Sequence, residues 1–195
     1  MTRNAVIPAT ALARPTDLLK HYEQQAQDLR AQAGVGLSDP IDPFDFARRL
    51  NADVLFPEQI PGITKELLDG ILGMDAKDWS GGAHFLPDGR LQILVSSTQT
   101  KERCNVTILE ELAHRHYGHQ PSIIGSEGRS PYNREQEEEA YQTAAALLVP
   151  AKIAAMMVYS REPIDAITTQ YGASRKLVEM RITRLGFWKD YTHAA

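Results

Sequence analysis

The stretch NVTILEELAHRHYGH, residues 105–119, decides how the chain folds around it, because its apolar residues recur with the period of a helix. At about 100° per residue, one face of this helix carries the side chains that we predict to be buried: Val106, Leu109, Ala113 and Tyr117. Glu110 and His114 lie one turn apart at the border of this face, and Glu111 points further away from it. A carboxylate this close to an apolar face is costly unless a metal ion or an arginine meets it.

A second helix is predicted over residues 134–148, where Pro150 stops it. Its apolar face consists of Ala140, Tyr141, Ala144, Ala145, Leu147 and Leu148. The same period places Glu137 near the centre of that face, so Glu110, His114 and Glu137 would form a three-ligand metal site with an open position for water. Because two of these ligands are carboxylates, we predict Zn²⁺ or another divalent metal such as Mn²⁺.

Two alternatives stay open for the ligand set. The acidic run EQEEE, residues 135–139, also fits the solvated face of a helix, in which case Glu137 would not bind metal. If Glu110 does not bind, other side chains of the two helices are alternative ligands: His116, His119, Glu138 and Glu139.

The segment EELAH, residues 110–114, is similar to the zinc-peptidase motif HExxH, with Glu110 in place of the first histidine. It follows LQILVSS and KERCNVTIL, and it precedes EEEAYQTAAALLVP, which matches a second motif of the ImmA/IrrE metallopeptidases in order and spacing. The chain therefore resembles this family over roughly residues 40–150, in a variant EExxH form.

The resemblance implies that His114 and Glu137 are metal ligands, that Glu111 is the general base and that Glu110 occupies the position of the missing ligand. Members of the family are site-specific endopeptidases that act on helix-turn-helix transcriptional repressors. The function expected is hydrolysis of such a repressor by metal-activated water. The substrate strand would pair with an edge strand at residues 91–96.

Three departures from the family pattern leave an alternative function open. Tyr141 and Thr143 differ from the second motif, and Glu110 adds a negative charge that lowers the Lewis acidity of a bound ion. We expect slower chemistry than in a two-histidine relative. The alternative is a catalytically impaired pseudo-peptidase that regulates a repressor by binding it.

The predicted fold class is α+β, with a zincin-like core in which a small antiparallel or mixed sheet packs on helices, followed by a C-terminal helical pair. Helices are expected over residues 16–34 and 44–50 and a strand over residues 54–56. A β region with a PDG hairpin turn is expected over residues 70–97. The predicted domains are a flexible leader (1–15), the peptidase domain (16–150) and a helical extension (151–195).

The helical extension resembles a helix-turn-helix, with a turn at Gly172 and an N-cap at Ser174. Four basic residues of its last helix are candidates for contact with DNA or a protein partner: Arg175, Lys176, Arg181 and Arg184. Docking on the peptidase domain or on a repressor is the favoured role, and DNA contact is the less favoured one.

Composition narrows the class of protein further. A net charge of -4 argues against a surface built wholly for nucleic acid. The single cysteine, Cys104, excludes an intrachain disulfide and indicates a reducing compartment. No apolar run approaches the roughly 18 residues that span a bilayer, and the first residues lack the apolar core of a secretory signal. A cytoplasmic protein without membrane contact is therefore expected.

Overall fold

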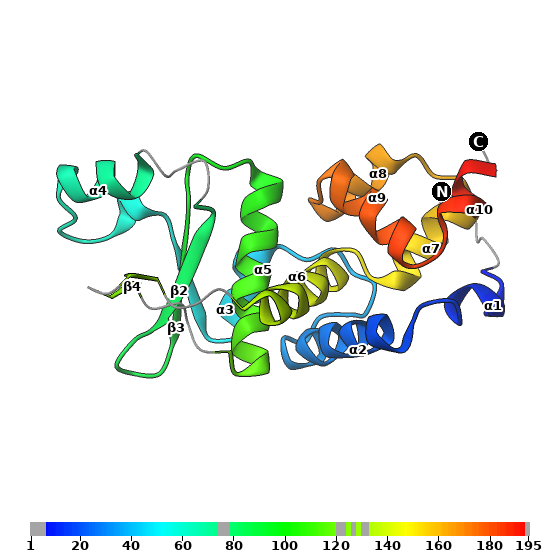
Figure 1. The fold of residues 1–195 in the computed structure, drawn as a ribbon, viewed down its shortest axis with the longest axis horizontal. Helices are drawn as coiled ribbons and strands as arrows, with labels where there is room; N and C mark the ends of the chain where they lie inside the picture. Colours follow the sequence, from blue (N-terminus) through cyan, green and yellow to red (C-terminus); the bar gives the residue numbers. More distant parts are fainter. Residues whose placement is uncertain (1–6, 74–78, 120–123, 126–127, 130–132, 194–195) are drawn as a thin grey trace. The chain divides into compact units, whose positions relative to one another are not determined.

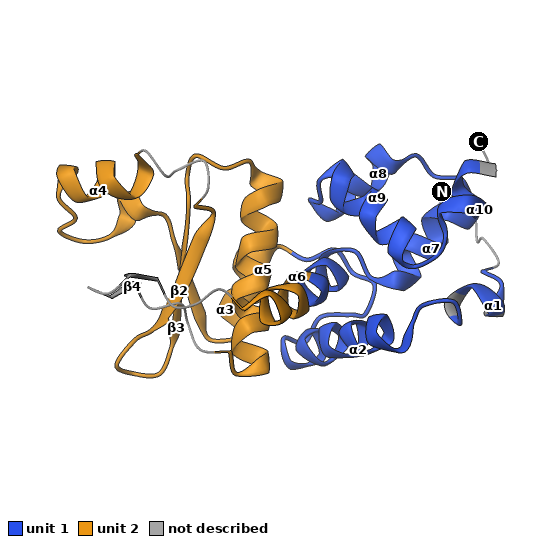
Figure 2. Cartoon of the chain, viewed as in Figure 1, with its two compact units in different colours: residues 1–41, 142–195 blue, residues 42–141 orange. Residues whose placement is uncertain are grey.

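The computed structural model describes residues 7–73, 79–119, 124–125, 128–129 and 133–193 (Figure 1). The chain forms two compact units (Figure 2). Unit 1 comprises residues 1–41 and 142–195, and unit 2 comprises residues 42–141. The boundary between them falls inside the helix α6, Arg134–Leu148.

Unit 2 is a mixed α+β structure, which confirms the predicted fold class. Its elements, besides the first half of α6, are α3 (Pro43–Arg49), β1 (Ala52–Leu55), the short helix η1 (Pro57–Gln59), α4 (Lys65–Leu72), β2 (Gly81–Phe85), β3 (Leu91–Val95), α5 (Lys101–Tyr117), β4 (Ile124–Gly125) and β5 (Gly128–Arg129).

The main sheet of unit 2 has the strand order β1-β3-β2. β1 runs parallel to β3, and β2 runs antiparallel to it. Alternate residues of β3 are buried, namely Leu91, Ile93 and Val95, as expected for a strand with one face against a core. Helix α5 packs on β2 and β3 and supplies the other side of that core (Figure 1).

The central place of β3 corrects the prediction that residues 91–96 form an edge strand. In the described part of the chain the edges of this sheet are β1 and β2. The predicted hairpin is present, because the turn residue Gly89 has φ +82° and its N–H donates to the carbonyl of Leu86. A hairpin alone does not show which of its strands will be covered by a third.

A second correction concerns the start of the predicted β region. Residues 70–72 belong to helix α4, not to a strand. Thr64 caps this helix, and its side chain accepts a hydrogen bond from the backbone N–H of Leu67. Such a cap directly before an apolar run favours a helix over a strand.

All secondary-structure elements in the described part of unit 1 are helices. Its elements, besides the second half of α6, are α1 (Ala9–Leu12), α2 (Asp17–Gln32), α7 (Ala151–Ser160), α8 (Ile164–Tyr171), α9 (Arg175–Arg184) and α10 (Trp188–His193). The predicted helix–turn–helix is present as α8 and α9, with Gly172 at φ +60° and the Ser174 side chain accepting from the N–H of Leu177.

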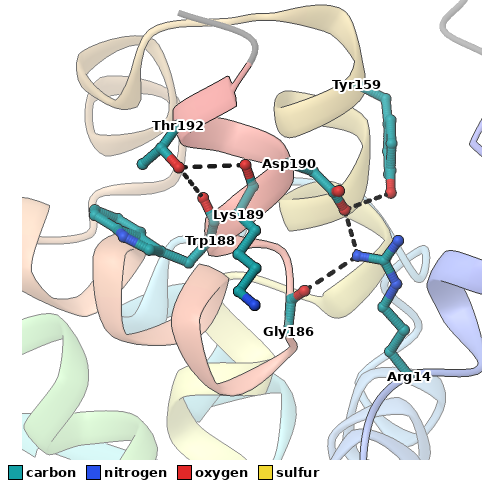
Figure 3. Close-up of polar contacts among 7 residues, drawn as sticks. All are labelled: Arg14, Tyr159, Gly186, Trp188, Lys189, Asp190 and Thr192. Carbon is teal, nitrogen blue, oxygen red and sulfur yellow. Dashed lines mark hydrogen bonds and ion pairs between the residues drawn. The ribbon is translucent and has the colours of Figure 1, made fainter.

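Within the predicted leader, residues 1–15, the structure describes residues 7–15, which include α1. Residues 1–6 lie outside the described residues. Arg14 donates to the carbonyl of Gly186 at 3.1 Å and pairs with Asp190 (Figure 3). Tyr159 donates to the same carboxylate at 2.8 Å, so the leader, α7 and α10 meet at one ion-paired point.

The compact units do not follow the predicted domain boundaries at residues 15 and 150. Helix α2, assigned from sequence to the peptidase domain, belongs with the C-terminal helices. No single helix in the described ranges has the length and apolar content to cross a bilayer, although α6 and α7 pass that test together across a 52° bend.

Candidate metal centre

Helix α5 carries the predicted site, and its ends are well defined. Thr100 caps the N-terminus by accepting from the N–H of Arg103, and Gly118 ends the helix at φ +71°. Val106, Leu109 and Ala113 are buried as predicted, whereas Tyr117 is only partly buried. The helix phase derived from the sequence is therefore right at the positions that place Glu110 and His114.

His114 and Glu137 face each other in unit 2. Nε2 of His114 lies 3.7 Å from Oε2 of Glu137. The His114 side chain is 20% exposed and that of Glu137 is 42% exposed, so water reaches the carboxylate more easily than the imidazole. Glu137 is thus the acid of EQEEE that faces His114, although its side chain is largely exposed.

Glu110 is a partly buried carboxyl group at the same place. Burial raises its pKa to about 7, and the negative charge of Glu137 adds to the shift, while Arg103 opposes it. Arg103 itself donates to Ser80 at 3.1 Å and is exposed, so it compensates the carboxylate only in part. Glu110 is thus an acid that lacks a close, buried positive partner among the described residues.

Burial also lowers the pKa of His114, which favours the neutral imidazole. Glu137 opposes this shift by attraction, and His119 adds to it by repulsion. A neutral imidazole is the form that binds a metal ion.

His119, one of the alternative ligands named from the sequence, lies beside His114. The Nδ1 atoms of the two rings are 2.9 Å apart, within hydrogen-bond distance. Nε2 of His119 lies 3.3 Å from Oε2 of Glu139, and the His119 side chain is only 7% exposed. His119 and Glu139, two of the alternative ligands, therefore form an extended cluster with the predicted site.

Three other predicted residues are less closely defined. Glu111, His116 and Glu138 are partly exposed. The ring of His116 meets that of Tyr117 edge-on, at 5.6 Å between centroids. Glu111 follows Glu110 on α5, so its side chain leaves the helix about 100° around the axis from that of Glu110.

The donor set fits a divalent cation in chemistry, although no three His, Cys, Asp or Glu side chains in the described ranges are grouped to hold one. Two donors at about 2.05 Å from a tetrahedral ion stand roughly 3.3 Å apart. The 3.7 Å between His114 and Glu137 is close to this spacing and too long for a hydrogen bond. The raised pKa of Glu110 means that its ionised form is disfavoured by burial at this position.

Arg115 is a structural residue that the sequence analysis missed. Its guanidinium donates to the carbonyls of Leu50 at 2.7 Å and Asn51 at 3.4 Å, at the end of α3. Burial lowers its pKa. This contact attaches the C-terminal half of α5, which carries the candidate site residues, to α3.

The basic residues of α9 are separate from this centre and differ from the prediction in part. Arg181 is fully buried, donates to the carbonyl of Val149 at 3.0 Å and pairs with Glu23, so it is not available at the surface. Arg175 is exposed but pairs with Glu179 and Asp165, both at 2.9 Å. Lys176 and Arg184 are exposed.

A helix with an ExxH segment lies against a small mixed sheet, and its His114 faces a carboxylate of a second, acidic helix. Comparison of families makes this specific. Residues 71–183 match the IrrE N-terminal-like domain, peptidase family M78, and the chain belongs to that family. The family is generally metal-dependent.

Solved structures and curated proteins add little to the assignment. A Mycobacterium tuberculosis transcriptional regulator is 13% identical, with a TM-score of 0.49 over 88% of this chain and 49% of its own. The chain thus spans about half the length of that protein. No curated protein matches the sequence.

Proposed function

We propose that this protein is a metal-dependent endopeptidase that cleaves a helix-turn-helix transcriptional repressor. The observation that carries the proposal is the 3.7 Å approach of His114 Nε2 to the Glu137 carboxylate, beside a partly buried acid whose pKa is raised. Membership in peptidase family M78 supports the class of reaction. The repressor substrate is carried over from the family resemblance.

In this proposal some residues bind the metal ion and another transfers a proton. His114 and Glu137 would hold a divalent ion, Zn²⁺ or Mn²⁺, and Glu110 would be the third ligand. The ion would supply Lewis acidity, which lowers the pKa of a water molecule and polarises the scissile carbonyl. Glu111 would accept the proton of the attacking water and pass it to the leaving amine.

The substrate strand would pair with β2, since residues 91–96 do not form an edge. Ser96 donates to the carbonyl of Ser80, and Leu86 donates to that of Arg90. Because hydrogen-bonded pairs alternate along an antiparallel ladder, the N–H groups of Gly81, Ala83 and Phe85 point away from β3. They are the donors that an extended peptide would use.

Cleavage of a repressor tests the proposed endopeptidase activity. The substrate would be a helix-turn-helix repressor encoded beside this protein, incubated with the metal-loaded protein and with Glu111→Gln. We expect the native protein to cut it at one site and the variant to lose activity by about 10²-fold or more. Equal cleavage by both would show that Glu111 is not the base.

The use of β2 has its own test. Ala83→Pro removes one outward N–H, and Ala83→Val keeps it as the matched control. Cleavage should fall for Ala83→Pro, with metal affinity unchanged, and stay near the native rate for Ala83→Val. If both variants cut at the native rate, the peptide does not bind at this edge.

A second candidate function, a non-catalytic regulator that binds a repressor, is favoured by one observation. A carboxyl group with a pKa of about 7 stands where the HExxH motif has an imidazole. Metal analysis separates the two candidates: if the purified protein holds no stoichiometric metal after zinc or manganese is added, the enzyme reading fails.

DNA binding through α9 has the least support, because Arg181 is internal and Arg175 is ion-paired. A gel shift at two salt concentrations tests it, since phosphate contacts weaken steeply with salt.

A further inference from the structure

Four side chains of unit 2 form a continuous polar row: Glu137, His114, His119 and Glu139. Nε2 of His114 faces Glu137 at 3.7 Å, the two Nδ1 atoms are 2.9 Å apart, and Nε2 of His119 faces Glu139 at 3.3 Å. The proposed function uses Glu137 and His114. It gives no role to His119 and Glu139.

With both imidazoles neutral, this row lacks one N–H. Two neutral imidazoles carry two N–H groups, and the row has three gaps. The gap between the Nδ1 atoms takes one N–H, because two lone pairs at 2.9 Å would repel. The second N–H can point at only one of the two outer carboxylates, Glu137 or Glu139. The other carboxylate then faces the lone pair of an imidazole nitrogen.

The geometry selects which carboxylate faces the lone pair. The contact from His119 to Glu139 is the shorter of the two outer contacts and the closer to hydrogen-bond distance. This places the N–H of His119 on Nε2, which faces Glu139, and leaves Nδ1 as the acceptor toward His114. His114 then donates from Nδ1, and its Nε2 lone pair points toward Glu137.

The position of His119 is set by the end of α5. Gly118 adopts φ +71°, and the N–H of His119 donates to the carbonyl of His114 at 2.9 Å, as in a helix C-cap with a left-handed residue. The ring of His119 also stacks on that of Tyr117, with 14° between planes and 5.3 Å between centroids. These contacts hold His119 at the one place from which it reaches His114.

We propose that His119 and Glu139 are positioning residues and not metal ligands: they hold His114 in the tautomer whose Nε2 lone pair is directed at Glu137. A divalent cation between His114 and Glu137 would occupy the gap that has no N–H. This inference therefore rests on the proposed function. Carboxylate–histidine pairs behind a metal-binding imidazole fix its orientation in the same way.

The tautomer itself is tested without metal. Long-range ¹H–¹⁵N spectra of the metal-free protein at a pH where both rings are neutral distinguish Nδ1–H from Nε2–H imidazoles. We expect His114 to be Nδ1–H and His119 to be Nε2–H. If His114 is Nε2–H, the inference is overturned, whatever the protein does with metal.

Two variants of His119 separate positioning from packing and from ligation. His119→Phe keeps the ring that stacks on Tyr117 but removes the acceptor, whereas His119→Asn keeps an acceptor near Nδ1 but removes the ring. Glu135→Gln, an exposed change on α6, is the control for lost charge. Zinc affinity is measured by competition with a chelator, and the coordination by the visible spectrum of the cobalt-loaded protein.

We expect His119→Phe to bind zinc about 10–100-fold more weakly, His119→Asn to stay closer to the native affinity, and the cobalt spectrum to be unchanged at saturation. Native affinity in His119→Phe would make His119 a packing residue and overturn the inference. A changed cobalt spectrum in both variants would make it a ligand and overturn it too. If the native protein binds no metal while His114 is Nδ1–H, the proposed function fails and the tautomer assignment stands.

Discussion

Glu110 is the residue at which this site departs from a two-histidine centre. Its position, one turn before His114 at the border of the buried face of α5, follows from the helix period. Its consequence follows from burial, which raises its pKa to about 7. A carboxyl group in this state costs the metal-free protein stability whenever it is ionised.

Replacing Glu110 by Gln should therefore change how stability depends on pH. The folded pKa of about 7 lies above the ordinary 4.5, so the protonated group favours folding, and this contribution is lost as the pH rises from 4.5 through 7. The loss amounts to about 3 kcal/mol at most. Urea unfolding of the metal-free native protein between pH 4.5 and 8 should show it, and Glu110→Gln should not.

The control for that experiment is Glu135→Gln, which removes an exposed carboxylate of α6. It should follow the native profile. Parallel profiles for the native protein and Glu110→Gln would mean that Glu110 titrates alike in the folded and unfolded chains.

Replacing Glu110 by His should strengthen metal binding. The variant recreates an HExxH segment with an imidazole, a donor that suits zinc, and it replaces a carboxyl group with a pKa of about 7 that has to lose its proton before it binds. We expect zinc affinity to rise by at least about tenfold, or about 1.4 kcal/mol, and repressor cleavage to rise with it. An affinity equal to that of the native protein would show that position 110 does not reach the ion.

At the scale of the elements, the contact between β2 and α5 depends on a missing side chain. A Cβ on Gly81 would stand 2.5 Å from the Thr107 methyl group and 2.6 Å from the Leu94 carbonyl oxygen. A Cβ on the neighbouring Gly82 would meet nothing within 4 Å. At Gly81, β2 therefore lies so close to α5 and β3 that there is no room for a side chain.

Gly81→Ala should destabilise the protein by about 1–3 kcal/mol, the usual cost of overpacking a core. Gly82→Ala is the matched control and should stay within about 0.5 kcal/mol of the native value. The free energy of unfolding in urea measures both. Adding Thr107→Ser to Gly81→Ala removes the crowding methyl group and should recover part of the loss; similar losses for the two glycine variants would contradict this packing.

At the scale of the whole molecule, unit 1 joins distant parts of the chain through one buried ion pair. Glu23 of α2 pairs with Arg181 of α9, and it also accepts from the N–H of Ala151 at 2.9 Å, at the start of α7. Arg181 further donates to the carbonyl of Val149. This explains why α2 belongs with the C-terminal helices.

Glu23→Gln should destabilise the protein by about 3 kcal/mol or more, because it leaves Arg181 buried without a counter-charge. Asp17→Asn, which breaks an exposed pair with Lys20 on the same helix, should cost at most about 1 kcal/mol. Urea unfolding compares them. Zinc affinity should be unchanged in Glu23→Gln while it is folded, since the proposed ligands all lie in unit 2; equal destabilisation by the two variants would contradict the role of the buried pair.

Periodicity and caps were sufficient for the helices that carry the site. Helix α6 spans residues 134–148 as predicted, and Glu137 is the acid of its acidic run that faces His114. Local patterns were insufficient where the position of an element depends on packing against a segment distant in sequence. The edge assignment of residues 91–96 was wrong because β1, from residues 52–55, covers β3.

The amino-acid order alone therefore determines the family, the α+β class and the phase of α5 that sets Glu110 and His114 one turn apart, since these depend on local sequence patterns. Only the tertiary structure shows that His119 lies between His114 and Glu139. It also shows that Arg181 is buried. The physical reason is the same in both cases. Burial and hydrogen bonding between segments distant in sequence set the role of these ionisable groups, and no local pattern encodes which groups will meet.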